Sequence, residues 1–198
     1  SSIPETEDLY DNGRYDFLKM SSSGADLYGR KIVSSESFVW HGRAYHTTPE
    51  KIKRFADELI TAGINEIIYH GYPYQYMDRP FPGWHPFAKG GAFSSDMNQH
   101  NPFWPYLAPL NEYITRLQYI SQTGTNVAAV ALLHDSLTHG AEEMPPTPQL
   151  NQALLEGGYN YDHINVASLQ RGTVHEGGRI SAGGPRYSAL VVPPLDAI

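Results

Sequence analysis

The sequence predicts an α/β fold in which helices alternate with short parallel strands. Segments with an apolar face at helical spacing recur along the chain, and short apolar runs of strand length follow them. Strands that are joined through helices pair in parallel. Hydrophobic residues make up 40% of the 198 residues, so a packed core is expected rather than disorder.

The first helix–strand step occupies residues 16–38. Residues 16–28 are expected to be helical, and Gly29 stands where a helix C′ glycine belongs. The inward positions of this helix are predicted to be Phe17, Met20 and Leu27. The strand that follows starts with a β-branched run and ends on Glu36.

The second step has the clearest helix signal. Thr48 can cap this helix and Pro49 fits its first position. Its apolar stripe has the spacing of one helix face and consists of Ile52, Phe55, Ala56, Leu59 and Ile60. Residues 64–69 read as another buried strand, which ends on His70.

The rest of the chain continues the alternation. A helix is expected over residues 103–124 and a nearly all-apolar strand over 126–133, which suits burial on both faces. Short helices are expected at 148–156 and 162–170, and a last strand at 187–192.

Two domains are expected. Residues 1–124 supply strand–helix units of a partial (β/α)8 TIM barrel, which needs eight such units when complete. Residues 125–198 look like the start of a doubly wound α/β domain. Because the chain ends soon after a strand, it is expected to be a fragment of a larger enzyme whose partners include the remainder of the catalytic barrel.

Composition excludes several classes of function. The net charge is −7 with 14 Lys and Arg, which argues against a nucleic-acid partner. No apolar run approaches 18 residues, so no membrane partner is expected. The absence of cysteine excludes disulfides, thiolate catalysis and Cys-ligated zinc. No secretory apolar region follows Ser1, so any targeting signal is expected to be absent or already removed.

The candidate site lies at two successive strand ends. Glu36 is followed by Trp40 and His41, and the next strand runs into His70 and Tyr72. In an α/β barrel both strand ends point to the same face, where catalytic groups are presented. Glu36 is the catalytic candidate, and the rings and imidazoles are candidates for binding substrate.

Plainer alternatives stay open for these residues. Glu36 could pair with Arg30 or Arg43, and His70 could be a structural hydrogen-bonding group. Trp40, and Trp84 in the aromatic loop of residues 70–102, could pack rather than stack on a ligand.

Three further features favour structural roles. Trp104 is expected in the core of the following helix, and Asn65 is expected to tie strand ends together. Adjacent residues on a strand point to opposite faces, so residues 134–136, His-Asp-Ser, do not make a catalytic triad.

Several segments together resemble the α-L-rhamnosidases of glycoside hydrolase family 106, in that family's order. They include the motif Ser-Glu-Ser-Phe around Glu36 and span residues 21–38, 62–65, 70–75, 82–84, 113–120 and 187–193. The resemblance implies a (β/α)8 catalytic domain followed by a flavodoxin-like domain. It implies inverting hydrolysis of terminal α-L-rhamnosyl residues, with one glutamic acid as general acid and another as general base.

The resemblance assigns Glu36 to the general base, whereas the general acid has no counterpart in this chain. It also implies a calcium ion near the sugar, without placing its ligands on particular residues. A rhamnose-containing carbohydrate would be the substrate, and a periplasmic or secreted bacterial location is expected.

The residues agree with a base at Glu36, because His41, His70 and nearby tyrosines can donate hydrogen bonds to an ionised carboxylate. Inverting hydrolysis needs two carboxyl groups about 6.5–9.5 Å apart, with a water held by the base. His70 and Tyr72 could fix sugar hydroxyls, and Trp40 or Trp84 could stack on an apolar sugar face. Two alternatives remain: a different barrel glycosidase of the β-galactosidase type, and a carbohydrate-binding piece without turnover.

Overall fold

The computed structural model describes residues 2–7, 15–40, 46–72, 95–134 and 148–193. Its elements in chain order are β1 (Glu5–Glu7), α1 (Tyr15–Leu27), β2 (Ser34–Ser37), α2 (Pro49–Thr61), β3 (Glu66–Tyr69), the 3₁₀ helix η1 (Trp104–Tyr106), α3 (Leu107–Thr123), β4 (Val130–Leu133), α4 (Pro148–Glu156), β5 (Tyr161–Ile164), α5 (Val166–Gln170), β6 (Thr173–Val174), the 3₁₀ helix η2 (Glu176–Gly178), β7 (Ile180–Ser181), β8 (Arg186–Tyr187) and β9 (Ala189–Val191). The predicted α/β class is confirmed.

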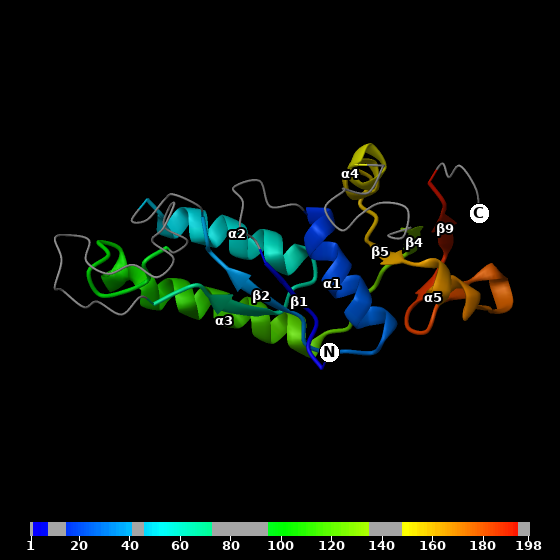
Figure 1. The fold of residues 1–198 in the computed structure, drawn as a ribbon, viewed down its shortest axis with the longest axis horizontal. Coiled ribbons are helices and arrows are strands. Elements are labelled where there is room, and N and C mark those ends of the chain that lie inside the picture. The colour runs from blue at the N-terminus through cyan, green and yellow to red at the C-terminus, as the bar shows by residue number, and fades with distance from the viewer. Residues whose placement is uncertain (1, 8–14, 41–45, 73–94, 135–147, 194–198) are drawn as a thin grey trace.

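The first sheet is parallel and has the strand order β1-β2-β3. Helices α2 and α3 lie together beside it (Figure 1). Thr48 caps α2 by accepting a hydrogen bond from the Lys51 N–H, and Pro49 is its first residue, as predicted. The stripe of α2 is buried at Ile52, Phe55, Ala56 and Leu59.

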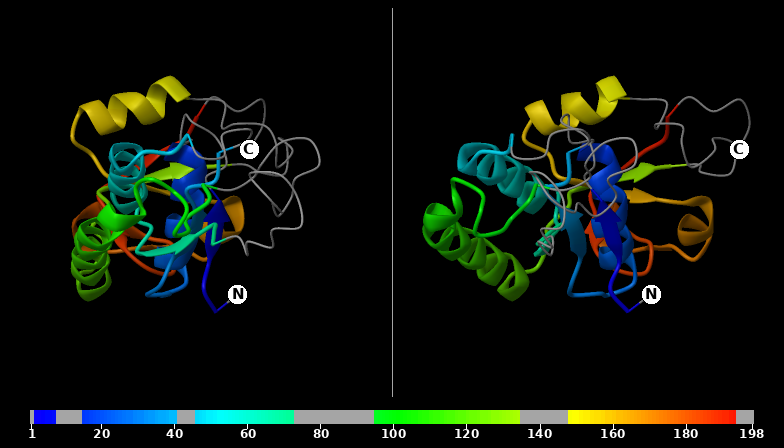
Figure 2. Two further views of the ribbon diagram at one scale, coloured as in Figure 1. Left: turned by 90° about the vertical axis from the view of Figure 1, so that its left-hand side faces the viewer. Right: turned by 60° about the vertical axis from the view of Figure 1, so that its left-hand side comes forward.

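The second sheet is also parallel, with the order β5-β4-β9. On one face Leu150 and Leu154 of α4 pack against β4 and β5; this helix is drawn in yellow in Figure 2. Strands β6, β7 and β8 form a small antiparallel sheet. The strand predicted at 126–133 is present over its second half only, as β4, whose four residues are all buried as predicted.

Helix α1 contacts strands of both parallel sheets, β1 and β5 (Figure 1). The prediction that Phe17 and Met20 face inward is wrong, because both are exposed. The face that is buried is largely polar and includes Lys19, Ser22 and Ser23. The buried face of α1 has no apolar stripe that could reveal it in the sequence. Its polar groups can be buried because they form hydrogen bonds and an ion pair.

The segment 162–170 was expected to be one helix, and this is wrong for its first residues. Residues 161–164 form β5, which pairs with β4 and is buried throughout. Asn165 then caps α5 by accepting a hydrogen bond from the Ser168 N–H, so the helix begins later. Among the helices of the described ranges, none is both long and apolar enough to cross a membrane.

Candidate functional site

Glu36 lies on β2 between two parallel neighbours. It is in register with Glu7 of β1 on one side and with Ile68 of β3 on the other. The Glu36 side chain is 38% exposed. Because Glu7 and Glu36 are register partners on parallel strands, their side chains lie on the same face of the sheet. Two carboxyl groups therefore meet near the carboxyl ends of the first sheet, where α/β enzymes place their chemistry.

The closeness of the two carboxyl groups affects how readily Glu7 loses its proton. Partial burial raises the pKa of Glu7, and the hydrogen bond and negative charge of Glu36 raise it further. Glu5 adds in the same direction, whereas His70 opposes it. Glu7 therefore keeps a proton to higher pH than an isolated glutamic acid does.

His70 lies close to Glu36, as the strand-end prediction expected. Its Nε2 is 3.9 Å from Glu36 Oε1, which is beyond hydrogen-bond length but within ion-pair distance when the imidazole is protonated. The His70 backbone N–H donates to the Ser37 carbonyl at 3.0 Å, which ties the end of β3 to the end of β2. This bond fixes the height of His70 relative to Glu36.

The backbone turns sharply after Glu36. Phe38 has φ = 66°, a left-handed conformation that is unfavourable for a bulky residue. Its buried ring packs edge-on against Tyr69 at 5.1 Å, and its carbonyl accepts a hydrogen bond from the Ser95 hydroxyl. These contacts hold the strained turn, a kind of strain that clusters at functional sites.

Trp40 lies in the core, only 2% exposed. Its ring contacts Phe55 edge-on at 5.2 Å, and the Lys51 ammonium lies 4.0 Å from the ring centroid. The geometry thus matches the packing alternative, and the structure does not place Trp40 with the exposed candidates for sugar binding. His41 and Trp84 lie outside the described residues.

Tyr72 lies on the surface, 61% exposed. Its hydroxyl donates to Gln99 Oε1 at 2.5 Å, and its ring lies edge-on to Trp104 at 6.0 Å. Trp104 was expected in the core of the helix, and this is wrong because its side chain is 36% exposed. The 3₁₀ turn η1 that precedes α3 leaves this ring beside Tyr72.

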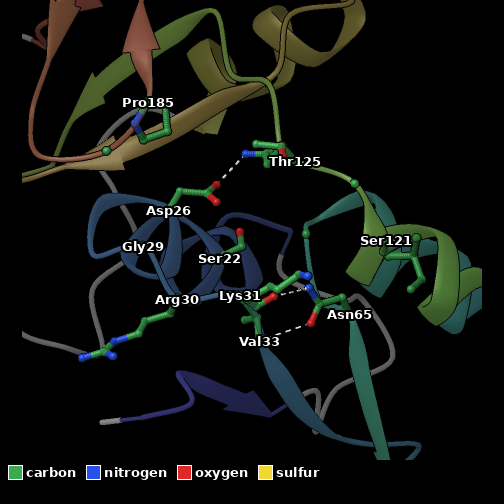
Figure 3. Close-up of a pocket in the computed structure, with 15 residues that line it drawn as sticks. Ser22, Asp26, Gly29, Arg30, Lys31, Val33, Asn65, Ser121, Thr125 and Pro185 are labelled. Carbon is green, nitrogen blue, oxygen red and sulfur yellow. Dashed lines mark hydrogen bonds between the residues drawn. The ribbon is translucent and has the colours of Figure 1, made fainter.

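A cavity of about 730 Å³ lies at the other end of the first sheet (Figure 3). It is lined by Arg30 and Asn65, among others. Arg30 comes before the first residue of β2, Ser34, whereas Glu36 lies near the other end of the strand, and no ion pair joins the two side chains. The Arg43 alternative falls outside the described residues.

Asn65 in this cavity has the structural role that was predicted for it. Its Oδ1 accepts from the Val33 N–H at 2.9 Å, and its Nδ2 donates to the Lys31 carbonyl at 2.8 Å. Nearby, Asn126 Nδ2 donates to Asp26 Oδ2 at 2.5 Å. The polar side chains that line this cavity form hydrogen bonds with neighbouring protein groups. This favours a structural role for the cavity over a second active site.

Glu7 is the functional candidate that sequence reasoning missed. The segment Glu5-Thr6-Glu7 is polar, and it becomes a strand because it pairs with β2 over three residues. The only available signal was two acids spaced two apart on either side of a threonine, which is too common a pattern to select. Within the described ranges, no group of three or more His, Asp or Glu side chains could hold a metal ion.

Comparison with known proteins gives consistent results. The alpha-L-rhamnosidase model of glycoside hydrolase family 106 matches residues 6–197. A protein of Formosa agariphila, whose name provisionally assigns it as a beta-glucuronidase, is 32% identical over 187 residues, covering 93% of this chain and 15% of that protein. The rhamnosidase structure from Novosphingobium sp. PP1Y matches with a TM-score of 0.73 at 26% identity, covering 97% of this chain and 18% of that one.

The chain thus spans less than a fifth of the length of either relative. The family match nevertheless covers nearly all of its residues, and the solved rhamnosidase shares its fold over the same extent. The chain belongs to glycoside hydrolase family 106, the alpha-L-rhamnosidase family.

Proposed function

We propose that this chain carries the general base of an inverting glycosidase that removes terminal α-L-rhamnosyl residues from glycosides or saccharides. Glu36 would take a proton from the water that attacks the anomeric carbon. His70 would bind hydroxyls of the rhamnose beside it, and Tyr72 would bind hydroxyls elsewhere on the saccharide. The observation that carries the proposal is the position of Glu36, partly exposed between Glu7 and His70 near the carboxyl ends of β1–β3.

Glu7 supports the base rather than acting as its acid partner. An inverting pair stands about 6.5–9.5 Å apart so that a water fits beside the base. Glu7 and Glu36 are register partners on neighbouring strands, which lie about 4.8 Å apart, so they are closer than that arrangement requires. The raised pKa of Glu7 favours its protonated form, so Glu7 places less negative charge beside Glu36 than an ordinary glutamate would. The acid would then come from a part of the catalytic unit outside the described residues.

The first sheet is proposed to be one arc of a (β/α)8 barrel. Three adjacent parallel strands with helices packed beside them are the repeating arrangement of such barrels. The second parallel sheet would open a flavodoxin-like domain, with the boundary near residue 124. The remainder of the barrel would complete the site around Glu36.

A calcium ion near the sugar is also part of the proposal. Calcium takes six to eight oxygen ligands, whereas no group of three or more His, Asp or Glu side chains in the described ranges could hold a metal ion. Its ligands would therefore come from the remainder of the catalytic unit. When bound, calcium would supply a fixed positive charge that orients sugar hydroxyls.

The test is a product analysis with the longest polypeptide that contains this chain. Hydrolysis of an α-L-rhamnoside is followed by proton NMR, and the first product formed is expected to be β-L-rhamnose, the inverted anomer. The matching β-galactoside and β-glucuronide are run in parallel, because a β-galactosidase-type enzyme is the alternative and the Formosa relative carries a glucuronidase name. Release of α-L-rhamnose first, or turnover of another sugar only, would reject the proposal.

A further inference from the structure

A small aromatic and polar patch lies on the surface after β3. It consists of Tyr72, Gln99, His100 and Trp104, and we refer to it as the aromatic patch. Tyr72 is 61% exposed and Trp104 36%, and their rings meet edge-on at 6.0 Å and 64°. The Tyr72 hydroxyl bonds Gln99 at 2.5 Å, and Gln99 Nε2 lies 3.3 Å from His100 Nε2.

The patch lies at the same end of the sheet as Glu36. Tyr72 follows Ile68 by four residues, and Ile68 is the register partner of Glu36. The Cα atoms of Tyr72 and Ile68 are thus at most about 14 Å apart, the length of four fully extended residues. The Met97 N–H also donates to the Gly71 carbonyl at 3.1 Å, which joins the segment bearing Gln99 and Trp104 to the end of β3.

Hydrogen bonds of buried neighbouring residues fix the segment that carries the patch. Asn101 is 3% exposed, and its Nδ2 donates to the carbonyls of Ser95 and Asp96 at 3.3 and 3.2 Å. The His100 N–H donates to Asn98 Oδ1 at 2.9 Å. A surface that is rigid before binding loses little conformational entropy when a ligand orders on it.

The chemistry of the patch matches a sugar. Aromatic rings offer apolar faces with large contact area, and a pyranose has an apolar face of C–H groups. The amide and imidazole supply donors and acceptors for the hydroxyls around that face. Scattered exposed aromatic residues are ordinary, but here two rings lie with an amide, an imidazole and a hydroxyl at the same end of the sheet as the candidate base.

We propose that the aromatic patch is a subsite for the sugar on the leaving-group side of the scissile bond. This inference rests on the proposed function. If the enzyme cleaves a terminal rhamnose held at Glu36, any second sugar lies on the leaving-group side of the bond. The patch is within reach of an oligosaccharide that extends from Glu36 along that side.

The experiment compares Trp104→Ala and Trp104→Phe with the unchanged enzyme on two substrates. One is a rhamnosyl-oligosaccharide, which has a sugar leaving group, and the other is α-L-rhamnosyl fluoride, whose leaving group is a single atom. Trp104→Ala is expected to lower kcat/KM for the oligosaccharide about tenfold, mainly through KM, because that factor matches the energy of one aromatic contact. Trp104→Phe is expected to recover part of the loss.

The fluoride substrate distinguishes the loss of a subsite from a general disturbance of the fold. Its turnover by Trp104→Ala is expected to stay within about twofold of the unchanged enzyme, since it makes no contact with the patch. Tyr119→Ala is the matched control, because Tyr119 is 69% exposed on α3. Equal losses on both substrates, or no loss on either, would overturn the subsite. If the unchanged enzyme hydrolysed neither substrate, the proposed function itself would fail.

Discussion

At the scale of single residues, neighbours in space decide which aromatic side chains are available to a ligand. Trp40 follows β2 and Trp104 begins η1, and Trp40 is 2% exposed whereas Trp104 is 36% exposed. The sequence around each one cannot separate these outcomes. Trp40 is buried because α2 brings Phe55 and Lys51 against its ring.

This difference gives a prediction for stability. Trp40→Ala is expected to lower the free energy of unfolding by about 3–5 kcal/mol, because a large buried ring leaves a cavity. Trp104→Ala, at a partly exposed site, is expected to cost much less. Urea denaturation of both variants measures the difference. Equal costs would contradict the core position of Trp40.

At the scale of elements, the contact between α1 and β5 depends on buried charge. Lys19 Nζ lies 3.5 Å from Asp162 Oδ1, with the two side chains 1% and 0% exposed, and it donates to Asn160 Oδ1 at 3.2 Å. Burial lowers the pKa of Lys19 and raises that of Asp162 to about 6, each against the attraction of its partner. The effect of burial on these two pKa values is therefore larger than the effect of the attraction between the two charges.

Removing one partner tests that contact. Lys19→Met is expected to destabilise the chain by about 3–5 kcal/mol, because Asp162 is left buried without its cation. The double variant Lys19→Met with Asp162→Leu is expected to recover much of that loss. Lys53→Met is the matched control, since the pair between Lys53 and Asp57 on α2 is exposed and screened by solvent, so its loss is expected to have little effect on stability. A double variant no more stable than the single one would refute the explanation.

The same scale shows what could be predicted and why. Helix α2 was predicted from its cap, its proline and its apolar stripe, all of which are local signals. Strand β1 could not be, because three polar residues become a strand only through pairing with β2. The polar face of α1 was missed for the same reason, since its partners lie some 140 residues away, as in the bond from the His163 N–H to the Ser23 hydroxyl.

The candidate site divides in the same way. Glu36 and His70 follow strand runs that are visible in the sequence, and the structure brings them within 3.9 Å. Glu7 joins them only through sheet register. Acids on a short polar strand carry no signal until the neighbouring strand is known.

At the scale of the whole molecule, His163 makes stability depend on pH. Burial, together with the nearby His134 and Lys19, lowers its pKa from 6.5 to about 3. Asp16 Oδ1 lies 3.9 Å from its Nε2, too far for a hydrogen bond that would offset this burial. The folded chain therefore keeps His163 neutral at pH values where the unfolded chain protonates it.

The direction of this pH dependence follows from which state, folded or unfolded, binds the proton. Between pH 6.5 and 3 the unfolded state binds the proton, so the contribution of His163 to stability is lost as the pH falls. The raised pKa of Asp162 has the opposite effect on stability below about pH 6. Asp162 is present in both the unchanged chain and the His163→Gln variant, so its effect cancels when the two are compared. Relative to His163→Gln, the unchanged chain is expected to lose up to about 1.4 kcal/mol more per pH unit. Parallel slopes in denaturation at pH 4 to 6 would exclude this role.

The central claim is that Glu36 is the proton acceptor, and kcat of Glu36→Gln for rhamnosyl fluoride tests it most directly. The longest polypeptide containing this chain is used, with Glu66→Gln, at the start of neighbouring β3, as the matched control. Glu36→Gln is expected to lose roughly 100- to 10,000-fold in kcat, the usual contribution of a general base, while still binding rhamnose. The control is expected to stay near full activity. Turnover by Glu36→Gln at the rate of the unchanged enzyme would contradict the assignment.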